Sequence, residues 1–575
     1  MSIPIEQKID SQVEDMPVTT QFNTVTSSSL TTSDIEMQEE EEGEAYYQEI
    51  EEAPITWKTY VMCGFASFGG IYFGYDSGYI SGVMAMDYFI HEFTGKVDDG
   101  TTNFALDAWQ KSLITSILSA GTFFGALIAG DLADNIGRKI TVILGCIVFI
   151  IGVILQIIST TIALLAVGRV IAGFGVGFVS STIILYMSEI SPKKIRGAIV
   201  SGYQFCITIG LLLASCVDYG TQNRNDSGSY RIPIAIQILW ALILGIGLLF
   251  LPESPRFFVK KNKHDKARKS LAFLRSQPIN SRFVETELNQ IIENFQLEQS
   301  LIPTQTYWQS WSACFSGGLR NPSSNLRKTI LGTSLQMMQQ WTGINFIFYF
   351  GTTFFEELGT IHNEFLISII TTIVNVVSTP LSFYTVERLG RRTLLIYGAT
   401  GMFICEFIVA IAGTVDGQNQ QTVKAMISFI CIYIHFFAST WGPGAWVVIG
   451  EIFPIQIRSR GVGLSTASNW LWNCIIAVIT PYMVGTDKGN LGAKVFFIWG
   501  SLCVVCLIYS IFLIPETKGL TLEEVDRMLE ETTPFNSSKW KPHGYTEKQR
   551  ETIEHSGYNG SVELIDSKPE IGHIE

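Results

Sequence analysis

The chain has 575 residues, of which 47% are hydrophobic and 16% are charged, and its formal net charge is −13. Residues 1–56 hold 14 acidic residues and one lysine, and residues 519–575 hold 12 acidic and six basic residues. The stretch between these two ends holds 26 acidic and 32 basic residues. The acidic total therefore belongs to the two ends and does not indicate a basic partner, and the absence of a basic face or binding motif excludes a nucleic-acid partner.

The middle of the chain contains uncharged stretches that are too long for the core of a soluble protein. Residues 140–168 and 198–217 carry no charge, and a helix needs roughly 20 apolar residues to cross the hydrocarbon core of a bilayer. We therefore predict an all-α membrane protein with twelve transmembrane helices. The predicted spans are 57–85, 112–130, 140–159, 162–185, 198–217, 232–251, 329–354, 365–386, 393–413, 423–447, 463–483 and 494–514.

Polar segments divide these spans into two sets of six. The predicted parts are a disordered acidic tail (1–56), an N-terminal six-helix half (57–251), a loop with short cytoplasmic helices (252–328), a C-terminal six-helix half (329–514) and a second tail (515–575) with a short helix at 521–531. Lysine and arginine gather in the loops on the side of both tails, so both termini are predicted to be cytoplasmic, with the first span an uncleaved signal anchor.

The ten cysteines lie mostly within the predicted spans and lack the spacing of metal ligands. We predict no disulfides, no metal site and no cofactor. An enzyme is also not supported, because no nucleophile stands beside the intramembrane charges Asp76 and Arg169. The glycines of Gly173-x-Gly175-x-Gly177 follow no strand, which favours helix packing over a nucleotide-binding loop.

Three motifs occur twice. Gly137-Arg138-Lys139 after Asp134 matches Gly390-Arg391-Arg392 after Glu387, Glu189-Ile-Ser-Pro192 matches Glu451-Ile-Phe-Pro454, and Pro252-Glu253-Ser254 matches Pro515-Glu516-Thr517. The second copies follow the first by 253, 262 and 263 residues. A nearly constant offset predicts two halves of the same topology that rock about a site at the membrane midplane, which is a transporter architecture.

These motifs resemble the sugar porter family of the major facilitator superfamily, in particular fungal high-affinity glucose/xylose proton symporters and yeast hexose transporters. The resemblance covers about 57–530 and includes the stretches 69–78, 339–345 and 442–446. It implies transport of a monosaccharide (glucose, xylose or another hexose) across the plasma membrane by alternating access, with proton symport as the leading hypothesis. A facilitated-diffusion uniporter and a glucose sensor of the same fold are the alternatives; the short tail argues against the sensor.

Side-chain amides suit sugar hydroxyls because each amide has a donor and an acceptor end, and aromatic rings suit the C–H faces of a sugar. A helix break near Gly343 would let the amides of the seventh span converge. The alternative is that intramembrane amides only bond neighbouring helices. The resemblance implies substrate binding by Gln204, Gln339, Gln340, Asn345, Tyr349, Asn375, Trp446, Asn469, Trp470 and Asn473.

Asp76 lies well inside the first span, where a charge is costly unless it is paired. The resemblance implies that Asp76 and Arg169 form the proton-coupling pair, and the alternative is a static salt bridge. Glu406 is an unexpected charge in the ninth span, and we expect it to be neutral or to face a partner helix. His435 is expected to be a packed neutral imidazole.

Charged residues recur at the inner ends of the spans and are expected to form ion pairs between the halves when the inside is closed; otherwise they only fix orientation. The predicted inner gate consists of Arg138, Glu189, Arg196, Glu253, Arg391, Arg392, Glu451, Arg458, Arg460 and Glu516. Gly442-Pro443-Gly444 is expected to bend the tenth helix as a hinge.

Two kinds of modification site are expected outside the spans. Asn225-Asp226-Ser227 is a glycosylation sequon in a predicted outer loop. The tail lysines are candidate attachment points for ubiquitin, although no motif marks them: Lys8, Lys539, Lys541, Lys548 and Lys568.

Overall fold

The computed structural model describes residues 53–95, 106–301, 307–321, 324–357, 364–416, 419–485 and 488–542. Everything below concerns the unit Ile50–Glu575. The predicted acidic tail up to residue 52 and the lysines Lys8, Lys548 and Lys568 lie outside the described residues.

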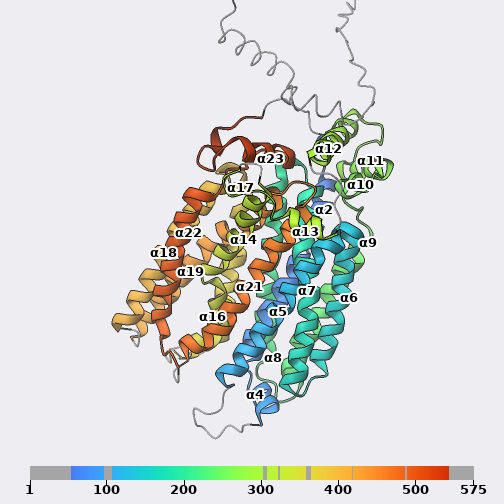
Figure 1. Cartoon of the computed structure of the whole chain (residues 1–575). Helices are drawn as coiled ribbons and strands as arrows, with labels where there is room; N and C mark the ends of the chain where they lie inside the picture. The colour runs from blue at the N-terminus through green and yellow to red at the C-terminus, as the bar shows by residue number, and fades with distance from the viewer. Residues whose placement is uncertain are drawn as a thin grey trace, which may run out of the picture. The chain divides into compact units, whose positions relative to one another are not determined.

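The first set of membrane helices runs from α2 to α9 and is joined to the second set by four shorter helices (Figure 1). The first set comprises α2 (Trp57–Ala66), α3 (Gly69–Val83), α4 (Asp87–Thr94), α5 (Ala108–Asn135), α6 (Arg138–Ile157), α7 (Ile162–Ile190), η1 (Lys193–Ile195), α8 (Arg196–Thr221) and α9 (Gly228–Leu249). The connecting helices are α10 (Pro255–Lys260), α11 (His264–Arg275), α12 (Arg282–Leu301) and α13 (Tyr307–Ala313).

The second set of membrane helices begins at α14, and a short helix follows it. It comprises α14 (Asn325–Trp341), α15 (Ile344–Glu357), α16 (Glu364–Ser378), α17 (Leu381–Arg388), α18 (Arg391–Asp416), α19 (Gln420–Phe436), η2 (Phe437–Trp441), α20 (Gly442–Glu451), α21 (Arg458–Val484), η3 (Gly492–Lys494) and α22 (Val495–Leu513). The predicted short helix is α23 (Leu522–Glu531), and a last turn η4 spans Ser537–Lys539.

Within the described residues, ten helices are long and apolar enough to cross a membrane. They coincide with ten of the twelve predicted spans. The other two predicted spans, the first and the seventh, are each split into two shorter helices, α2 with α3 and α14 with α15. The all-α fold with two six-helix halves is therefore confirmed, and the two remaining spans are broken helices.

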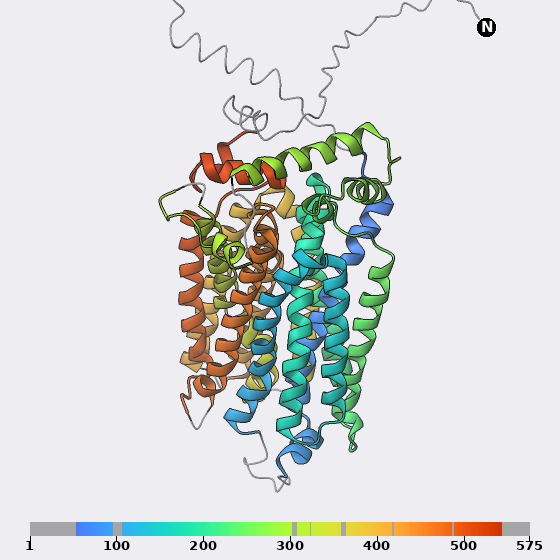
Figure 2. The same cartoon turned by 45° about the vertical axis from the view of Figure 1, so that its right-hand side comes forward.

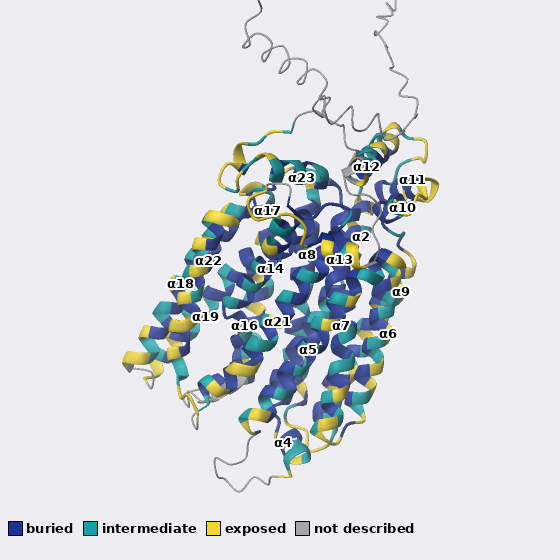
Figure 3. Ribbon diagram, in the orientation of Figure 1, coloured by how far each residue is buried: buried dark blue, intermediate teal, exposed yellow. Residues whose placement is uncertain are grey.

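The lipid-facing surface is visible as a stripe along α6. Ile140, Ile147, Ile151, Ile154 and Ile158 are all exposed, and their spacing of three, four or seven residues places them on one face of the helix. Exposed residues gather on the flanks and ends of the bundle, and buried residues fill its interior (Figure 3). An apolar outer face is what a helix in contact with lipid requires.

Helices in the first half approach one another closely at glycine. A Cβ added to Gly74 of α3 would lie 2.0 Å from the carbonyl oxygen of Ile207 in α8. In α7, a Cβ on Gly173 would lie 2.3 Å from the carbonyl oxygen of Leu118 in α5. The glycine run of α7 therefore serves helix packing, which is common in membrane bundles.

The break in the seventh span lies at the predicted place. Gly343 separates α14 from α15 and has a φ of +80°, a backbone conformation that favours glycine. The carbonyl group of Thr342, which the break frees from the helix, accepts a hydrogen bond of 2.7 Å from the Tyr433 hydroxyl. The tenth span differs from prediction: η2 is a π-helical segment before Gly442, and Pro443 lies in the first turn of α20. The irregularity thus precedes the predicted hinge.

Four short helices, α10–α12 and α23, lie at one end of the bundle, which we call the loop end, and α4 lies at the other end (Figures 1 and 2). Val259, Leu271 and Leu288 belong to a small apolar core that joins α10, α11 and α12, and Ile455 of the second half contributes to it. Helix α23 begins with a capping box, in which Thr521 and Glu524 bond each other's backbone N–H groups. The loop end is therefore a packed layer beneath both halves.

Candidate functional site

The two Pro-Glu motifs cap equivalent helices at the loop end. The Glu253 carboxylate accepts hydrogen bonds from the backbone N–H groups of Arg138 (3.0 Å) and Lys139 (3.1 Å) at the start of α6. Glu516 accepts from the N–H groups of Arg391 (2.9 Å) and Arg392 (3.2 Å) at the start of α18. A carboxylate at a helix N-terminus satisfies free N–H groups and the helix dipole.

Glycine makes room for each of these carboxylates. Gly137 and Gly390 have φ angles of +104° and +85°. A Cβ added to them would lie 2.4 Å from Glu253 Oε2 and 2.3 Å from Glu516 Oε2. The glycine, the arginine that follows it and the distant glutamate therefore form one structural unit that occurs once in each half.

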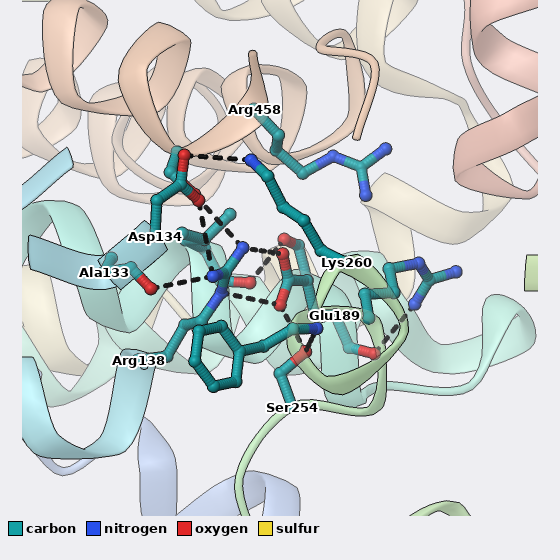
Figure 4. A network of polar contacts seen from close by, with 12 residues as sticks. Ala133, Asp134, Arg138, Glu189, Ser254, Lys260 and Arg458 are labelled. Atoms are coloured by element: carbon teal, nitrogen blue, oxygen red, sulfur yellow. Dashed lines mark hydrogen bonds and ion pairs between the residues drawn. The ribbon is translucent and has the colours of Figure 1, made fainter. Parts of the chain in front are cut away.

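Each unit also contains a buried arginine–glutamate pair. Arg138 donates through Nε and Nη2 to both oxygens of Glu189, each at 3.0 Å, and the Ser254 hydroxyl also donates to Glu189 (Figure 4). In the second half, Arg391 donates to Glu451 at 3.0 Å, and Glu451 accepts from the Thr517 hydroxyl at 2.7 Å. The residues that are repeated in the sequence therefore make corresponding hydrogen bonds in the two halves.

The contacts that join the halves at the loop end centre on two aspartates of α5. Asp134 bonds Lys260 (2.9 Å) and the Ser459 hydroxyl (2.5 Å) and lies 3.6 Å from Arg460. Asp131 accepts from Arg460 at 2.9 Å. Burial lowers the pKa of Lys260, although the Asp134 carboxylate opposes the shift. The carboxylates of α5 are thus paired both with Lys260 of α10 and with residues at the start of α21.

The corresponding place in the second half makes a weaker connection. Glu387, the counterpart of Asp134, accepts a hydrogen bond of 3.2 Å from the backbone N–H of Ala198 in α8. Arg196 reaches the carbonyl oxygen of Leu520 at 3.4 Å. The two halves have the same internal pairs, but the contacts that join them are stronger where α5 meets α21 than where α8 meets α17.

We expected the predicted gate residues to pair across the halves, and the structure places their main pairs within one half. Arg138–Glu189 and Arg391–Glu451 are internal, and Glu253 and Glu516 are helix caps. Arg392 and Arg458 donate to the carbonyl oxygens of Ile511 and Phe453. Arg138 (to Ser459, 3.1 Å), Arg196 (to Leu520, 3.4 Å) and Arg460 (to Asp131, 2.9 Å) do reach the far half or its tail.

Sequence reasoning missed five residues that make or anchor the contacts between the halves: Asp131, Asp134, Lys260, Glu387 and Ser459. The available signal was the pair of acids one turn apart, Asp131-x-x-Asp134, just before a basic motif. Asp134 and Glu387 were recognised as repeat positions but not as gate residues.

Helix α23 bonds basic residues of both halves and of the connecting loop. Glu523 pairs with Arg256 (3.1 Å), Glu524 pairs with Lys193 (3.5 Å), and Asp526 pairs with Lys328. Burial disfavours the charge of Glu523, but the guanidinium groups of Arg256, Arg458 and Arg196 outweigh it and lower the pKa of Glu523 to about 2. The tail helix is therefore an ionic strap across the loop end.

A narrow cavity lies between the halves, and we call it the central cavity. Its lining includes eight of the predicted binding residues: Gln204, Gln339, Gln340, Asn345, Tyr349, Trp446, Asn469 and Asn473. Aromatic and aliphatic walls complete it, among them Phe73, Phe348 and Phe437, which sequence reasoning did not single out. Amides facing apolar rings form a surface suited to a small polyhydroxylated molecule.

The amides of the central cavity are held by one another. Gln339 donates to the carbonyl oxygens of Trp441 (3.1 Å) and Gly442 (2.9 Å), and its own oxygen accepts from Asn469 at 2.7 Å. Gln340 accepts from Asn345 across the break at Gly343 and from Asn473 at 3.3 Å. The break therefore brings the amides of α14 and α15 together, as predicted.

Asn473 connects three elements. Its oxygen accepts from the Ser119 hydroxyl of α5 at 2.7 Å, and its nitrogen donates to the Tyr349 hydroxyl of α15 at 3.1 Å. The first bond crosses between the halves. The cavity is thus bounded by residues whose relative positions change if the halves rock.

Two predicted binding residues do not line the central cavity. Asn375 is buried on α16, and neither amide atom has a hydrogen-bond partner among the described residues. Trp470 packs edge-on against Phe73, with ring centroids 5.0 Å apart, and its indole nitrogen lies 3.3 Å from the Ser180 hydroxyl. Trp470 therefore supports the cavity wall from behind.

Asp76 and Arg169 are both buried, and they do not form an ion pair in this structure. Neither Asp76 oxygen has a hydrogen-bond partner within the described residues. Arg169 instead donates to the Tyr79 hydroxyl at 2.6 Å, and its guanidinium carbon lies 5.7 Å from the centroid of the Tyr79 ring. Tyr79 in turn donates to Gln156 at 2.7 Å. The predicted partners thus stand apart, with Tyr79 as the partner of the cation.

Two other intramembrane polar residues lie outside the central cavity. Glu406 is buried on α18 with its Cβ near Gly500 of α22, so it faces a partner helix. His435 shares a hydrogen bond of 2.9 Å with the Ser378 hydroxyl. These positions agree with packing roles.

A family model described as "Sugar (and other) transporter" matches residues 62–529. The chain belongs to the sugar transporter family. It is accordingly a multi-pass membrane protein of a transporter family and not an enzyme, as predicted. The match spans both halves, the connecting loop and the strap helix.

Curated fungal relatives agree with this family over most of the chain. The major facilitator-type transporter ecdD of Aspergillus rugulosus is 45% identical over 86% of this chain and 92% of its own length. The high glucose sensor RGT2 of Saccharomyces cerevisiae is 42% identical over 83% of this chain, which spans 61% of the sensor. The low-affinity glucose transporter HXT3 of the same yeast is 37% identical over 84% of each chain.

Solved structures share the fold. The proton:xylose symporter XylE bound to 6-bromo-6-deoxy-D-glucose has a TM-score of 0.70 at 24% identity, covering 82% of this chain and 99% of XylE. The inward-open conformation of XylE from E. coli has a TM-score of 0.59 at 25% identity, with the same coverage.

Proposed function

We propose that the chain imports a glucose-type monosaccharide, glucose or xylose among them, through the plasma membrane by proton-coupled alternating access. The amide-lined central cavity supports the sugar part of this proposal. Each amide that now bonds another amide offers both a donor and an acceptor to a sugar hydroxyl, and exchange of one such bond for another costs little. Asn375 and Trp470 act near the sugar in this proposal without lining the cavity in the present conformation.

The state seen here corresponds to a carrier closed on the inside. Lysines and arginines gather at the loop end, for example Lys139, Lys193 and Arg388, and the positive-inside rule then places this end and both tails in the cytoplasm. The contacts of Asp131 and Asp134 with α21 hold the halves together there. Opening to the cytoplasm requires those contacts to break while the internal Arg–Glu pairs persist.

The observation that supports proton coupling is the separation of Asp76 from Arg169. When Asp76 carries a proton it needs no counter-charge, and Arg169 is free to bond the Tyr79 hydroxyl, as it does here. When Asp76 loses the proton to the cytoplasm, a buried anion remains that attracts Arg169. Arg169 would thus exchange Tyr79 for Asp76 once in each cycle.

The membrane potential supplies the energy for accumulation. One proton that crosses about 100 mV releases roughly 2.3 kcal/mol, which is enough for more than tenfold accumulation of a sugar. In the competing uniporter, Asp76 and Arg169 have only a structural role and the sugar reaches the same concentration on both sides. Sugar accumulation against a gradient separates the two.

A glucose sensor is the second candidate, and one observation favours it. The identity to the sensor RGT2 is 42%, against 37% for the transporter HXT3. This chain spans 61% of the sensor's length and 84% of the transporter's. A sensor would bind sugar in the same central cavity but would signal through its tails without bulk uptake.

Modification sites fit the proposed orientation. Asn225 of the sequon is exposed between α8 and α9, at the end opposite the loop end, which is extracellular in this proposal. Lys539 and Lys541 are exposed just beyond the strap helix and would be cytoplasmic. They are the described members of the proposed ubiquitin sites. Replacing all five tail lysines with arginine should slow endocytosis if they are used.

The decisive experiment is expression in a yeast strain that lacks its own hexose carriers. A transporter restores growth on glucose and takes up radiolabelled glucose with saturable kinetics. The Gln340→Ala variant, at equal surface expression, should raise the Km because it removes an amide of the central cavity. Glucose-dependent signalling without uptake would instead assign the protein as a sensor.

A further inference from the structure

Tyr79 of α3 and Gln156 of α6 hold Arg169 of α7 through a chain of hydrogen bonds, and we call these two residues the arginine site. Arg169 Nη1 donates to the Tyr79 hydroxyl at 2.6 Å, and that hydroxyl donates to Gln156 Oε1 at 2.7 Å. All three side chains are buried. A buried guanidinium group without a carboxylate partner needs such a polar neighbour.

The bond between Arg169 and Tyr79 depends on Gln156. A guanidinium group donates hydrogen bonds and accepts none, so the Tyr79 oxygen can accept from Arg169 only when its own proton points elsewhere. The Gln156 oxygen accepts that proton. Close packing of α6 on α7 fixes the glutamine, because a Cβ added to Gly168 would lie 2.8 Å from Gln156 Cγ. Gln156 therefore orients the Tyr79 hydroxyl, and Tyr79 in turn positions Arg169.

Asp76 and Tyr79 are alternative partners for Arg169. They are three residues apart on α3, which places them on one face of the helix. A cation that is bonded to Tyr79 is not available to balance a charge on Asp76, and a buried carboxylate without a counter-charge is unfavourable. The arginine site therefore favours the protonated form of Asp76, whereas pairing with Arg169 favours the ionised form.

We propose that the arginine site sets the external pH at which the carrier takes up its proton, with Tyr79 and Gln156 as positioning residues. The inference rests on the proposed proton coupling by Asp76. Tyr79 and Gln156 contact neither the sugar nor the proton of Asp76 in this account, and they act only through Arg169. With the site intact, half-maximal uptake occurs at a higher external pH than it would if Arg169 were free to pair with Asp76.

The other titratable groups around this cluster do not explain such a pH dependence. On the helices α3, α6, α8 and α15 they are Tyr72, Tyr75, Cys146, Tyr203, Asp218 and Tyr349, and α9 contributes the uncharged Gln237. Tyrosine and buried cysteine are uncharged near neutral pH. Asp218 lies beside Gly82, six residues and about 9 Å of helix rise from Asp76. It is present in the wild type and in every variant below, so their comparison isolates the arginine site.

The test is uptake of labelled D-glucose into vesicles that contain the purified full-length protein, at fixed internal pH and at external pH from about 4 to about 8. Tyr79→Phe keeps the ring and removes the hydroxyl. Its half-maximal uptake should shift to lower pH by about one unit, a tenfold change in proton concentration, because bonds to charged groups are among the stronger ones. Its rate at the lowest pH should stay within twofold of the wild type. Gln156→Leu should shift the midpoint in the same direction by about half a unit, because Tyr79 keeps its hydroxyl but loses the acceptor for its proton.

Tyr75→Phe is the matched control. Tyr75 is buried on the same helix, its ring stacks on that of Tyr79 with centroids 6.5 Å apart, and its hydroxyl has no hydrogen-bond partner in the described part of the chain. Its pH profile should coincide with that of the wild type. In an Asp76→Asn background no proton is bound or released at this position, so adding Tyr79→Phe should leave the pH profile of sugar exchange unchanged.

Two results would overturn the arginine site. The first is uptake by Tyr79→Phe that falls by the same factor at every pH, which would assign Tyr79 a structural role alone. The second is a midpoint that stays in place or moves to higher pH; if Tyr79→Phe does not fold, the midpoint of Gln156→Leu decides.

Failure of the proposed function gives a different pattern. A wild-type profile that is flat and matches Asp76→Asn would reject proton coupling, and the arginine site with it. If the wild type and Asp76→Asn differ in pH dependence while Tyr79→Phe coincides with the wild type, the coupling stands and only the arginine site is rejected.

Discussion

The two halves of the molecule are nearly identical at the loop end and differ in the interior. Each half has a Gly-Arg unit capped by a distant glutamate and a buried arginine–glutamate pair. In the interior, the N-terminal half carries the buried pair of residues Asp76 and Arg169, the C-terminal half carries the buried Glu406, and the C-terminal half also supplies most amides of the central cavity. In the proposed function, the shared parts serve the movement common to both halves, and the differing parts divide the chemistry between proton and sugar.

The contacts between the halves are also unequal. Asp134 binds a lysine, a hydroxyl and an arginine, whereas Glu387 bonds one backbone N–H of the opposite half. The internal pairs of one half are therefore repeated in the other half, but the contacts that join the halves are not repeated. The side on which α5 meets α21 should control closure at the loop end.

The largest effect is expected for Asp76→Asn. Asparagine cannot release a proton, so Arg169 stays with Tyr79 and the proton gradient is no longer coupled to sugar. Accumulation of a non-metabolised glucose analogue should fall from more than tenfold to about one, while exchange of labelled for unlabelled sugar persists. Glu406→Gln is the control and should accumulate sugar normally. Continued accumulation by Asp76→Asn would show that the N-terminal half does not handle the proton.

The next effect concerns the amides of the C-terminal half. Asn473→Ala removes bonds to Ser119, Gln340 and Tyr349, and each neutral bond contributes about 1 kcal/mol. The Km for glucose uptake should rise about tenfold. Asn325→Ala, a buried amide at the loop end, should change the Km less than twofold. Equal effects of the two variants would contradict the division of chemistry between the halves.

A smaller effect separates the two sides of the gate. Asp134→Asn weakens several contacts between the halves and Glu387→Gln weakens one, so only the first should shift the population toward the inward-open state, by about fivefold. Spin labels on Lys194→Cys and Arg388→Cys, which are exposed on opposite halves, with exposed Cys216 replaced by serine, report the distance at the loop end. A larger opening in Glu387→Gln would reverse the assignment.

The smallest effect is expected at the strap helix. The pKa of Glu523 lies at about 2, below its ordinary value of 4.5, so its ionic contacts are fully present above pH 4.5 and weaken only as the pH falls toward 2. Glu523→Gln should change uptake less than twofold and leave the pH profile between 5 and 7.5 parallel to that of the wild type. A changed profile would place pH sensing at the loop end and not in the interior.

The fold and much of the site were predictable because their signals are local. Uncharged stretches locate the membrane helices, repeated motifs locate the halves, and the glutamine and asparagine residues near Gly343 locate the central cavity. The predicted fifth span ended at Val217 because Asp218 is charged, yet α8 continues to Thr221 and buries that carboxylate. Composition along the helix therefore placed its end too early, because it does not show that this carboxylate is buried.

Contacts between distant elements could not be predicted in the same way. Ser459 bonds Asp134 across 325 residues, and Arg169 bonds Tyr79 across 90. Tyr79 lies one turn from Asp76, and nothing in its sequence context marks it as the partner of a cation. The choice among nearby partners for a buried charge depends on packing of several helices, which the sequence pattern does not express.

The central claim is that proton movement in the N-terminal half drives sugar movement in the C-terminal half. Sugar uptake with simultaneous recording of external pH tests it most directly, in cells whose only hexose carrier is this protein. The account predicts alkalinisation of the medium when glucose is added, uptake that an uncoupler abolishes, and neither response in Asp76→Asn. Glucose uptake without alkalinisation and insensitive to the uncoupler would contradict it.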